Sequence, residues 1–270
     1  QTTGRVVILA HGNNQGQGWA QLCRVISSAT KAKGRKKETS LDFSELTSLF
    51  RDQANCTILL GLESEISRLV ISEPTRAKEL ARSWIENFPI PGSLAIEIVN
   101  HLTEPGKIGS AQHARAMLDL AIDLGIPAVL TNAVRYIEPD GALTADVLDS
   151  ARHLEALGLF EPQPNAQAWL KPMSKMAAIA LEITEDTALS LSLIKTTELL
   201  AEKCFLDPKL DCGWGQPKTP EKSALGITGN PFEVLWQKTH AAIDWRYPNI
   251  KAAGLADVQH QLSKELIAVN

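Results

Sequence analysis

The chain has 270 residues, of which 44% are hydrophobic, and its formal net charge is -4. This length and apolar content are enough for one large or two modest domains with hydrophobic cores. The slightly acidic balance excludes a protein that binds nucleic acid through a global basic field, so any such contact must be local.

The cysteine spacing and the length of the apolar runs indicate in which cellular compartment the protein is found. The four cysteines lie far apart and form no C-x-x-C pair, which favours reduced thiols in a cytoplasmic protein over zinc ligands or disulfides. No run approaches the roughly 20 apolar residues of a membrane span. We therefore expect no membrane partner. The chain begins at Gln1, without Met and just before an apolar run, which predicts a piece of a longer protein.

The first 140 residues alternate strand-like and helix-like patterns. Short apolar runs predict strands over residues 5–10, 57–60, 94–99 and from 128 onward. Helical spacing of apolar residues, with caps expected at Asp42, Ser64, Ser72 and Ser110, predicts helices between them. Strands and helices in alternation predict a parallel α/β layer, either an open sheet or part of a barrel.

The pattern changes after Tyr136. Helices are predicted over residues 144–157, 184–204, 231–245 and 255–269. The stretch 206–231 lacks apolar periodicity and is rich in Pro, Gly and Asp, which predicts a long loop or linker.

Residues at the ends of the predicted strands are candidates for chemistry, because α/β folds place their sites there. The run AVLTNAVRY (128–136) ends in Asn132 and Arg135 and contains no carboxylate or histidine. Glu97 lies on the third strand, and His101 follows it by four residues. The two could form a ligand pair, or His101 could be a structural, hydrogen-bonded histidine. The six histidines form no H-x-H or H-x-x-x-H pair of the kind that zinc sites use.

Two loops suggest phosphate contacts. AHGNNQGQGW follows a strand and precedes a helix, where a phosphate can bind, but it matches neither the P-loop nor the dinucleotide fingerprint, which favours a flexible loop. A basic run can contact DNA phosphates or form a solvated loop. It comprises Lys31, Lys33, Arg35, Lys36 and Lys37.

Taken in order, segments of this chain resemble the α subunit of bacterial DNA polymerase III, a C-family polymerase, and more closely its error-prone paralogue. The resemblance covers nearly the whole length and rests on RVVILAHGNNQGQGWAQLCRVIS, TILLGLESEI, AIEIVNHL, GIPAVLTNAVRY, DVLDSARHL, AWLKPMSKM, TTELLAEKC and WRYPN. Such polymerases begin with a polymerase-and-histidinol-phosphatase (PHP) domain, a distorted (βα)7 barrel. The resemblance implies that residues 1–140 are the C-terminal part of a degenerate PHP barrel. Residues 141–270 would be a mainly helical segment leading toward the polymerase palm.

The resemblance also implies a lost metal site. Metal-binding members hold a metal cluster at the strand ends for phosphoesterase or proofreading chemistry. Where they carry His, Cys, Asp and His, this chain carries Arg5, Leu62, Ala133 and Arg135; their remaining ligands belong to strands before Gln1. Two unit charges 4 Å apart interact by about 4 kcal/mol at an effective dielectric of 20, so the two arginines disfavour a divalent cation. We therefore expect no metal or other cofactor in this chain.

These implications give the expected function. The chain would be a non-catalytic fragment of an error-prone polymerase, acting as a structural scaffold. The parent would carry out Mg²⁺-dependent DNA synthesis in translesion repair, with DNA, deoxynucleotides and proteins of the replication or mutagenesis complex as partners. The palm's glycine-rich loop and Asp-x-Asp motif do not occur in the sequence, so we expect no polymerase activity. Arg5 and Arg135 should lie near each other, compensated by acidic side chains, backbone carbonyls or a bound anion, with Glu97 as the nearest candidate acid.

Two other functions stay open at this point. One is an active metal-dependent phosphoesterase or exonuclease that uses Glu97 and His101. The other is a free-standing small-molecule α/β enzyme, which a deep pocket with acid and base groups at the strand ends would favour.

Overall fold

The computed structural model describes residues 4–12, 15–31, 40–51, 55–157, 159, 162–215 and 221–269. The chain divides into two compact units, residues 1–214 and residues 215–270, and each is described by itself. The boundary that the family resemblance implies near residue 140 remains a prediction.

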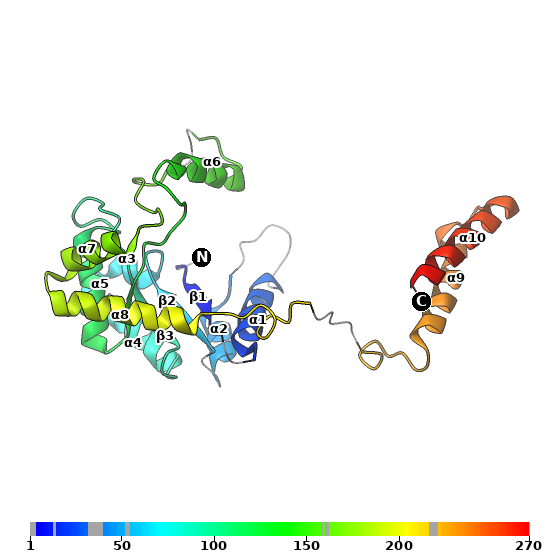
Figure 1. Cartoon of the computed structure of the whole chain (residues 1–270), viewed down its shortest axis with the longest axis horizontal. Helices are drawn as coiled ribbons and strands as arrows, with labels where there is room; N and C mark the ends of the chain where they lie inside the picture. Colours follow the sequence, from blue (N-terminus) through cyan, green and yellow to red (C-terminus); the bar gives the residue numbers. More distant parts are fainter. Residues whose placement is uncertain are drawn as a thin grey trace. The chain divides into compact units, whose positions relative to one another are not determined.

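A four-stranded sheet forms the centre of the first unit, in the order β1-β2-β3-β4 (Figure 1). Its strands are β1 (Val7–Ala10), β2 (Cys56–Leu60), β3 (Leu94–Ile98) and β4 (Ala128–Leu130). All four lie within or beside the apolar runs that predict strands. The last three strands are parallel, and Glu97 of β3 lies opposite Val129 of β4. The unit is therefore of the mixed α/β class.

The prediction of a wholly parallel layer is wrong at the first strand. β1 runs antiparallel to β2, with Val7 opposite Leu59 and Ala10 opposite Cys56. Two helices, α1 (Gln17–Lys31) and α2 (Phe43–Phe50), separate the two strands. A single helix would return the chain to the end of the sheet where β1 begins, as a parallel crossover requires. Instead, β2 begins with Cys56 opposite Ala10, at the end of the sheet where β1 stops, and runs back along β1.

Helices cover both faces of the parallel strands (Figure 1). On one face, Ile58, Ile96 and Ile98 belong to the larger core, which side chains of six helices complete together with Leu193 of the later helix 187–203. Besides α1 and α2, these are α3 (Glu65–Leu69), α4 (Pro74–Asn87), α5 (Ala111–Leu124) and α7 (Met173–Thr184). On the other face, Ala95 packs in a smaller core with Leu200 of α8 (Thr187–Lys203). Because side chains alternate along a strand, covering both faces buries every residue of β2 and β3.

Local signals fix several helix ends. Ser110 and Ser64 cap α5 and α3 with their side chains, as predicted, and Gly125 ends α5 with a φ of 67°. The cap expected at Ser72 is wrong by one residue, because α4 begins at Pro74 after an N-cap at Glu73. Proline suits the first helical turn, where its missing N–H is not needed.

The chain beyond residue 140 is mainly helical, as predicted. It contains α6 (Gly141–His153), α7 and α8 in the first unit, and α9 (Pro231–Arg246) and α10 (Ala252–Val269) in the second. The sequence analysis did not predict α7. None of the helices in the described part of the chain is apolar over a length that would cross a membrane.

Candidate functional site

At the carboxyl ends of the parallel strands, Gly61 lies beside Glu97 in one row on the face of the sheet that α8 covers. Thr131 lies on the same face, two residues beyond Val129, which is opposite Glu97. The Thr131 hydroxyl donates a 2.6 Å hydrogen bond to Glu97 Oε1. A Cβ added to Gly61 would lie 1.8 Å from Glu97 Oε2. Glycine at position 61 is therefore what admits the Glu97 carboxyl to this row.

The surroundings of Glu97 disfavour its charge. The residue is only 9% exposed, and this burial raises the pKa of the Glu97 carboxyl, while the hydrogen bond from Thr131 partly opposes the rise. Burial without a cationic partner favours the protonated acid over the carboxylate. Among the described residues, Glu97 forms no ion pair with an arginine, so the strand end holds a hydrogen-bonded acid.

His101 is tied to the end of β4. Its Nε2 lies 2.9 Å from the carbonyl oxygen of Asn132, so this nitrogen carries a proton and donates. Burial is the main cause of the lowered pKa of His101, and the nearby charge of Lys171 adds to it. The Asn165 side chain donates a 2.7 Å hydrogen bond to the His101 carbonyl oxygen. His101 is thus a neutral imidazole that holds two loops together, with partners separate from those of Glu97.

A polar network that the sequence analysis missed closes the end of β4. The Asn132 side chain is 5% exposed and donates to the carbonyl oxygens of Gln167 (2.7 Å) and Trp169 (2.6 Å). Its Oδ1 accepts a 2.9 Å hydrogen bond from Lys171 Nζ, which also lies 5.5 Å from the centre of the Trp169 ring. Burial lowers the pKa of Lys171. From the sequence, only the asparagine at the strand end can be identified. Its hydrogen-bond acceptors are backbone atoms of a distant segment, and no residue type marks them.

The two arginines that the resemblance predicts at former ligand positions, Arg5 and Arg135, pair with different acids. Arg5 lies 3.4 Å from Glu63, and both side chains are more than 60% exposed. Arg135 Nη2 lies 2.7 Å from Asp149 Oδ2, with side chains 40% and 18% exposed. The compensating acids are therefore Glu63 and Asp149, whereas the sequence analysis expected Glu97. The expected proximity of the two arginines remains a prediction.

The other two ligand positions, Leu62 and Ala133, contribute only backbone atoms. The Leu62 carbonyl accepts a 2.9 Å hydrogen bond from Ser67, and the Ala133 N–H donates to the Thr131 hydroxyl at 3.1 Å. Ala133 has a φ of 39°, which is uncommon for a residue with a side chain and marks the turn after β4. Within the described ranges, no three His, Cys, Asp or Glu side chains are grouped to hold a metal ion. Metal binding itself remains to be measured.

The glycine-rich loop before α1 packs against the chain itself. The Gly12 N–H donates to the Lys203 carbonyl at 2.8 Å, and a Cβ on Gly12 would lie 1.6 Å from the Phe205 oxygen. The Gly16 N–H donates to the buried Asp211 carboxylate at 3.1 Å. The carboxylate thus lies where the start of a helix would favour an anion. Residues 13 and 14 of this loop lie outside the described part of the chain, so the predicted flexibility of the loop remains a prediction. The first part of the predicted linker belongs to the first unit.

The basic run lies outside this description. Lys33, Arg35, Lys36 and Lys37 are not among the described residues, and of Lys31 only the backbone, at the end of α1, is described. The DNA contact expected there remains a prediction.

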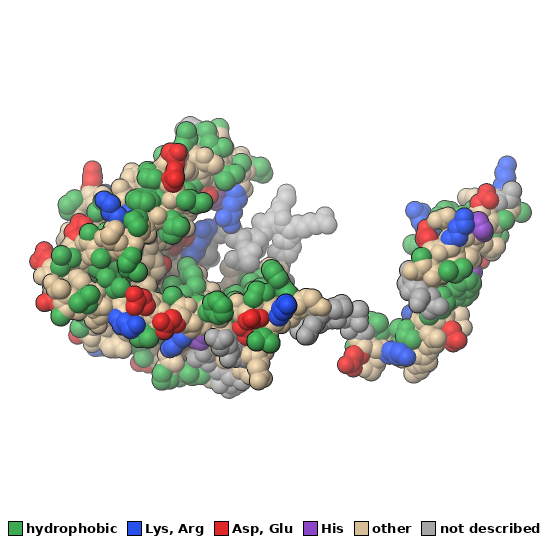
Figure 2. Space-filling model, viewed as in Figure 1, with side chains coloured by type: hydrophobic (Ala, Val, Ile, Leu, Met, Phe, Trp, Pro, Cys, Tyr) green, Lys and Arg blue, Asp and Glu red, His purple; other side chains and the backbone are tan. Residues whose placement is uncertain are grey.

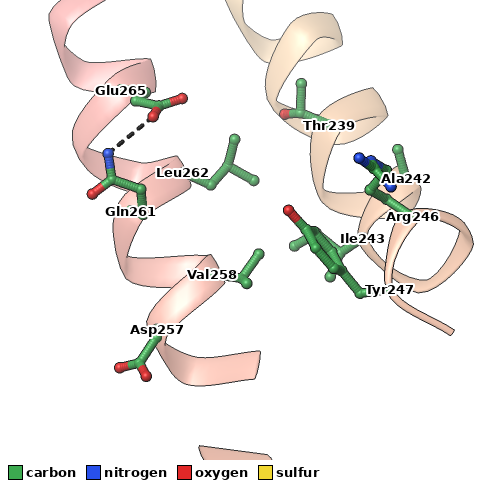
Figure 3. Close-up of a pocket in the computed structure, with 10 residues that line it drawn as sticks. All are labelled: Thr239, Ala242, Ile243, Arg246, Tyr247, Asp257, Val258, Gln261, Leu262 and Glu265. Carbon is green, nitrogen blue, oxygen red and sulfur yellow. Dashed lines mark hydrogen bonds between the residues drawn. The ribbon is translucent and has the colours of Figure 1, made fainter. Parts of the chain in front are cut away.

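Two cavities in the described part of the chain are lined by residues other than Glu97 and His101. One, of about 310 Å³, extends from Asn100 to the start of α5. The other, of about 510 Å³, lies between α9 and α10, where Val258 and Leu262 face Ile243 and Tyr247 (Figure 3). Neither cavity brings an acid and a base together at the strand ends, as a small-molecule enzyme would need.

Comparison with known proteins gives a distant similarity to DNA polymerases. The error-prone DNA polymerases of Brucella abortus biovar 1 (strain 9-941) and Brucella suis biovar 1 (strain 1330) are each 25% identical to this chain over 227 residues. The match covers 81% of this chain and 18% of each relative, so the chain spans less than a fifth of their length. No protein-family model matches the chain.

Proposed function

We propose that this chain is part of an error-prone polymerase resembling the DNA polymerase III α subunit. Residues 1–140 would be the later strands and helices of a degenerate (βα)7 PHP barrel, and residues 141–270 would lead toward the palm. The observation that carries the proposal is the 25% identity to error-prone DNA polymerases over 227 residues. Parallel strands with polar groups at their carboxyl ends are compatible with a barrel segment.

In this proposal the strand ends are a scaffold and not a metal centre. Arg5, Leu62, Ala133 and Arg135 do not fit a divalent cation, because a guanidinium has no lone pair to donate and an aliphatic side chain has none either. A guanidinium would also repel the ion by several kcal/mol at close range. The pair of Arg135 with Asp149 and the network of Asn132 provide the polar contacts there instead.

The remaining parts of the proposal concern the whole polymerase. Mg²⁺-dependent nucleotidyl transfer, DNA and deoxynucleotide binding, protein partners in replication or mutagenesis, and a cytoplasmic location follow by analogy with the relatives. The chain itself would have neither polymerase nor 3′-exonuclease activity.

Restoring the ligands tests the assignment directly. If the four positions form one degenerate site, the variant with Arg5→His, Leu62→Cys, Ala133→Asp and Arg135→His should bind zinc, since zinc accepts this set of donors. Arg135→His alone should not. Elemental analysis after dialysis against zinc would measure both, with circular dichroism to confirm folding. A folded fourfold variant without zinc, or an unmodified chain with stoichiometric zinc or manganese, would contradict the proposal.

Activity and DNA binding are tested on the unmodified chain. Primer-extension and primer-degradation assays with Mg²⁺, Mn²⁺ and Zn²⁺ should show no turnover.

DNA binding should be weak and should decrease steeply with salt, because only a few phosphates can be contacted. Replacing Lys36 and Lys37 with Ala should weaken it further, whereas the same change at Lys195 of α8 should not. Metal-dependent turnover, or binding that persists at high salt, would count against the proposal.

A further inference from the structure

The cavity of about 310 Å³ at the start of α5 is separate from the row of polar residues at the strand ends. Its wall includes Asn100 after β3, Ala111 and Gln112 of the first turn of α5, and Glu182 near the end of α7. The alternation that buries Ile98 in the larger core places Asn100 on the same face of the sheet, under α5 and α7. The cavity therefore lies on the face opposite to α8.

Asn100 is a buried amide with an unpaired donor. Its side chain is fully buried, and its Oδ1 accepts a 2.9 Å hydrogen bond from the Leu102 N–H, which fixes the direction in which the amide points. The Nδ2 atom makes no hydrogen bond to any described residue. A buried donor without an acceptor is costly, so an acceptor atom of a ligand would be stabilised at this position.

The first turn of α5 adds two more donors. The His113 N–H donates to the capping hydroxyl of Ser110 at 3.1 Å. Within the described ranges, the N–H groups of Ala111 and Gln112 make no hydrogen bond. Unpaired N–H groups at the start of a helix, together with the helix dipole, favour a carboxylate or another small anion. These donors and Asn100 thus favour the same kind of ligand atom.

An acid also lines the cavity. Arg115 of α5 donates to the carbonyl oxygens of Ile183 (3.5 Å) and Thr184 (2.8 Å), which holds the end of α7 beside the first turns of α5. Glu182 lines the cavity from this end of α7 and has no ion pair among the described residues, whereas Arg115 is paired with Asp119. A simple anion would therefore meet an uncompensated carboxylate, and a ligand that also carries a cationic group would not.

The charges around the cavity do not change this balance. Glu104 and Lys107, in the loop that leads to α5, are both exposed and of opposite sign, so they largely cancel. Over the face of the first unit that Figure 2 shows, acidic and basic side chains are likewise interspersed. The three donors and Glu182 therefore decide which ligand is selected.

We propose that this cavity binds a small zwitterion of the amino-acid type. The carboxylate of the ligand accepts hydrogen bonds from Asn100 Nδ2 and from the unpaired N–H groups at the start of α5, and its ammonium group binds Glu182. A volume of about 310 Å³ is at the lower end of the range for small-molecule sites, which suits a ligand of few atoms. Because the cavity and Glu97 lie on opposite faces of the sheet, the proposal does not depend on the proposed polymerase function.

Titration of the full 270-residue chain with L-alanine, acetate and methylammonium tests the class of ligand. Amide chemical shifts in NMR spectra would measure binding, and those of Ala111 and Gln112 should change. Alanine should bind with a dissociation constant on the order of 1 mM, because it has few atoms. Acetate and methylammonium should each bind about tenfold more weakly, since each lacks one of the two charged groups. Unchanged shifts at the solubility limit of alanine, or acetate binding as tight as that of alanine, would overturn the proposal.

Side-chain variants test the assigned contacts. Glu182→Gln should weaken alanine binding about tenfold without weakening acetate binding, because only alanine places an ammonium group there. Glu202→Gln is the matched control, since Glu202 is exposed on α8, which covers the other face of the sheet. Asn100→Asp keeps an acceptor for Leu102 but replaces the donor with a carboxylate oxygen, so alanine binding should be lost.

The amide spectrum of each variant would confirm that it folds. If Asn100→Asp does not fold, Glu182→Gln decides the matter, because it changes an exposed side chain. The proposal is wrong if Glu182→Gln binds alanine as the parent does, if Glu202→Gln weakens binding equally, or if a folded Asn100→Asp variant still binds alanine.

Discussion

The carboxyl ends of β3 and β4 are neighbours in one sheet, yet they accommodate polar side chains in different ways. At the end of β3, Glu97 is buried against Gly61 with a single side-chain partner, Thr131. At the end of β4, Asn132 makes three hydrogen bonds to a segment that begins more than thirty residues later. The first arrangement depends on steric room, and the second depends on complete hydrogen bonding.

This difference identifies what each strand end can tolerate. A buried polar group is stable when its hydrogen bonds are made, and it is costly when they are not. We therefore expect the β3 end to be most sensitive to added atoms, the β4 end to be most sensitive to lost hydrogen bonds, and the exposed ion pairs around them to matter least.

Adding one methyl group at the β3 end should cause the largest loss of stability. Gly61→Ala would place its Cβ within 2 Å of Glu97 Oε2 and force the carboxyl to move, so we expect unfolding free energy to fall by about 3 kcal/mol. Urea denaturation would measure it. In a Glu97→Ala background the same change should cost under about 1 kcal/mol. Equal costs in the two backgrounds would show that Glu97 is not the residue that requires glycine.

Removing hydrogen bonds at the β4 end should have the next largest effect. Asn132→Ala removes three hydrogen bonds, although Lys171 Nζ and the Gln167 carbonyl still bond each other, so we expect the free energy of unfolding to fall by about 2 kcal/mol. Asn87→Ala is the control, because Asn87 makes one hydrogen bond within its own helix and should cost about 0.5 kcal/mol or less. Indistinguishable denaturation midpoints for the two variants would mean that the network adds no stability.

Removing the ion pairs around the strand ends should reduce stability less than the changes above, and by different amounts for the two pairs. Arg135→Ala should cost about 1 kcal/mol, because its partner Asp149 is only 18% exposed. Arg5→Ala should cost about 0.3 kcal/mol, since both members of its pair are exposed. Thermal unfolding of the two variants side by side would measure the difference. A larger loss for Arg5→Ala than for Arg135→Ala would reverse the ranking of the two pairs.

The smallest expected effect is a change in how stability depends on pH. Because burial raises the pKa of Glu97 in the folded state, its contribution to stability is full below the pKa of an unfolded glutamate and is lost as the pH rises through the folded pKa. Glu97→Gln removes this loss and keeps an acceptor for Thr131. The free energy of unfolding of this variant, relative to that of the parent, should therefore increase as the pH rises above the pKa of an unfolded glutamate, about 4.3. Glu63→Gln, which changes an exposed carboxyl, should not alter this pH dependence. The same change in the pH dependence of stability for both variants would argue against the buried acid.

Much of the fold could be predicted from local patterns. Strands β2 and β3 are apolar runs bounded by turn residues, and the serine caps and Gly125 mark helix ends through their own backbone or side-chain chemistry. The candidate site was predicted only in part. Glu97 and His101 were identified by their places near a strand end, but Lys171 and Asp149 were not, because nothing in their own neighbourhood shows that they contact β4.

Sequence by itself determined the elements of this protein and the residue types available at its strand ends. Periodicity places the strands and most helices, and the polar residues Glu97, His101 and Asn132 near the strand ends can be seen in the chain alone. Only the tertiary structure decided that β1 runs antiparallel, that Asp211 packs on the glycine-rich loop, and that Arg135 pairs with Asp149. The physical reason is that periodicity and capping act within a few residues. Strand direction and partners for buried polar groups depend instead on how distant segments meet.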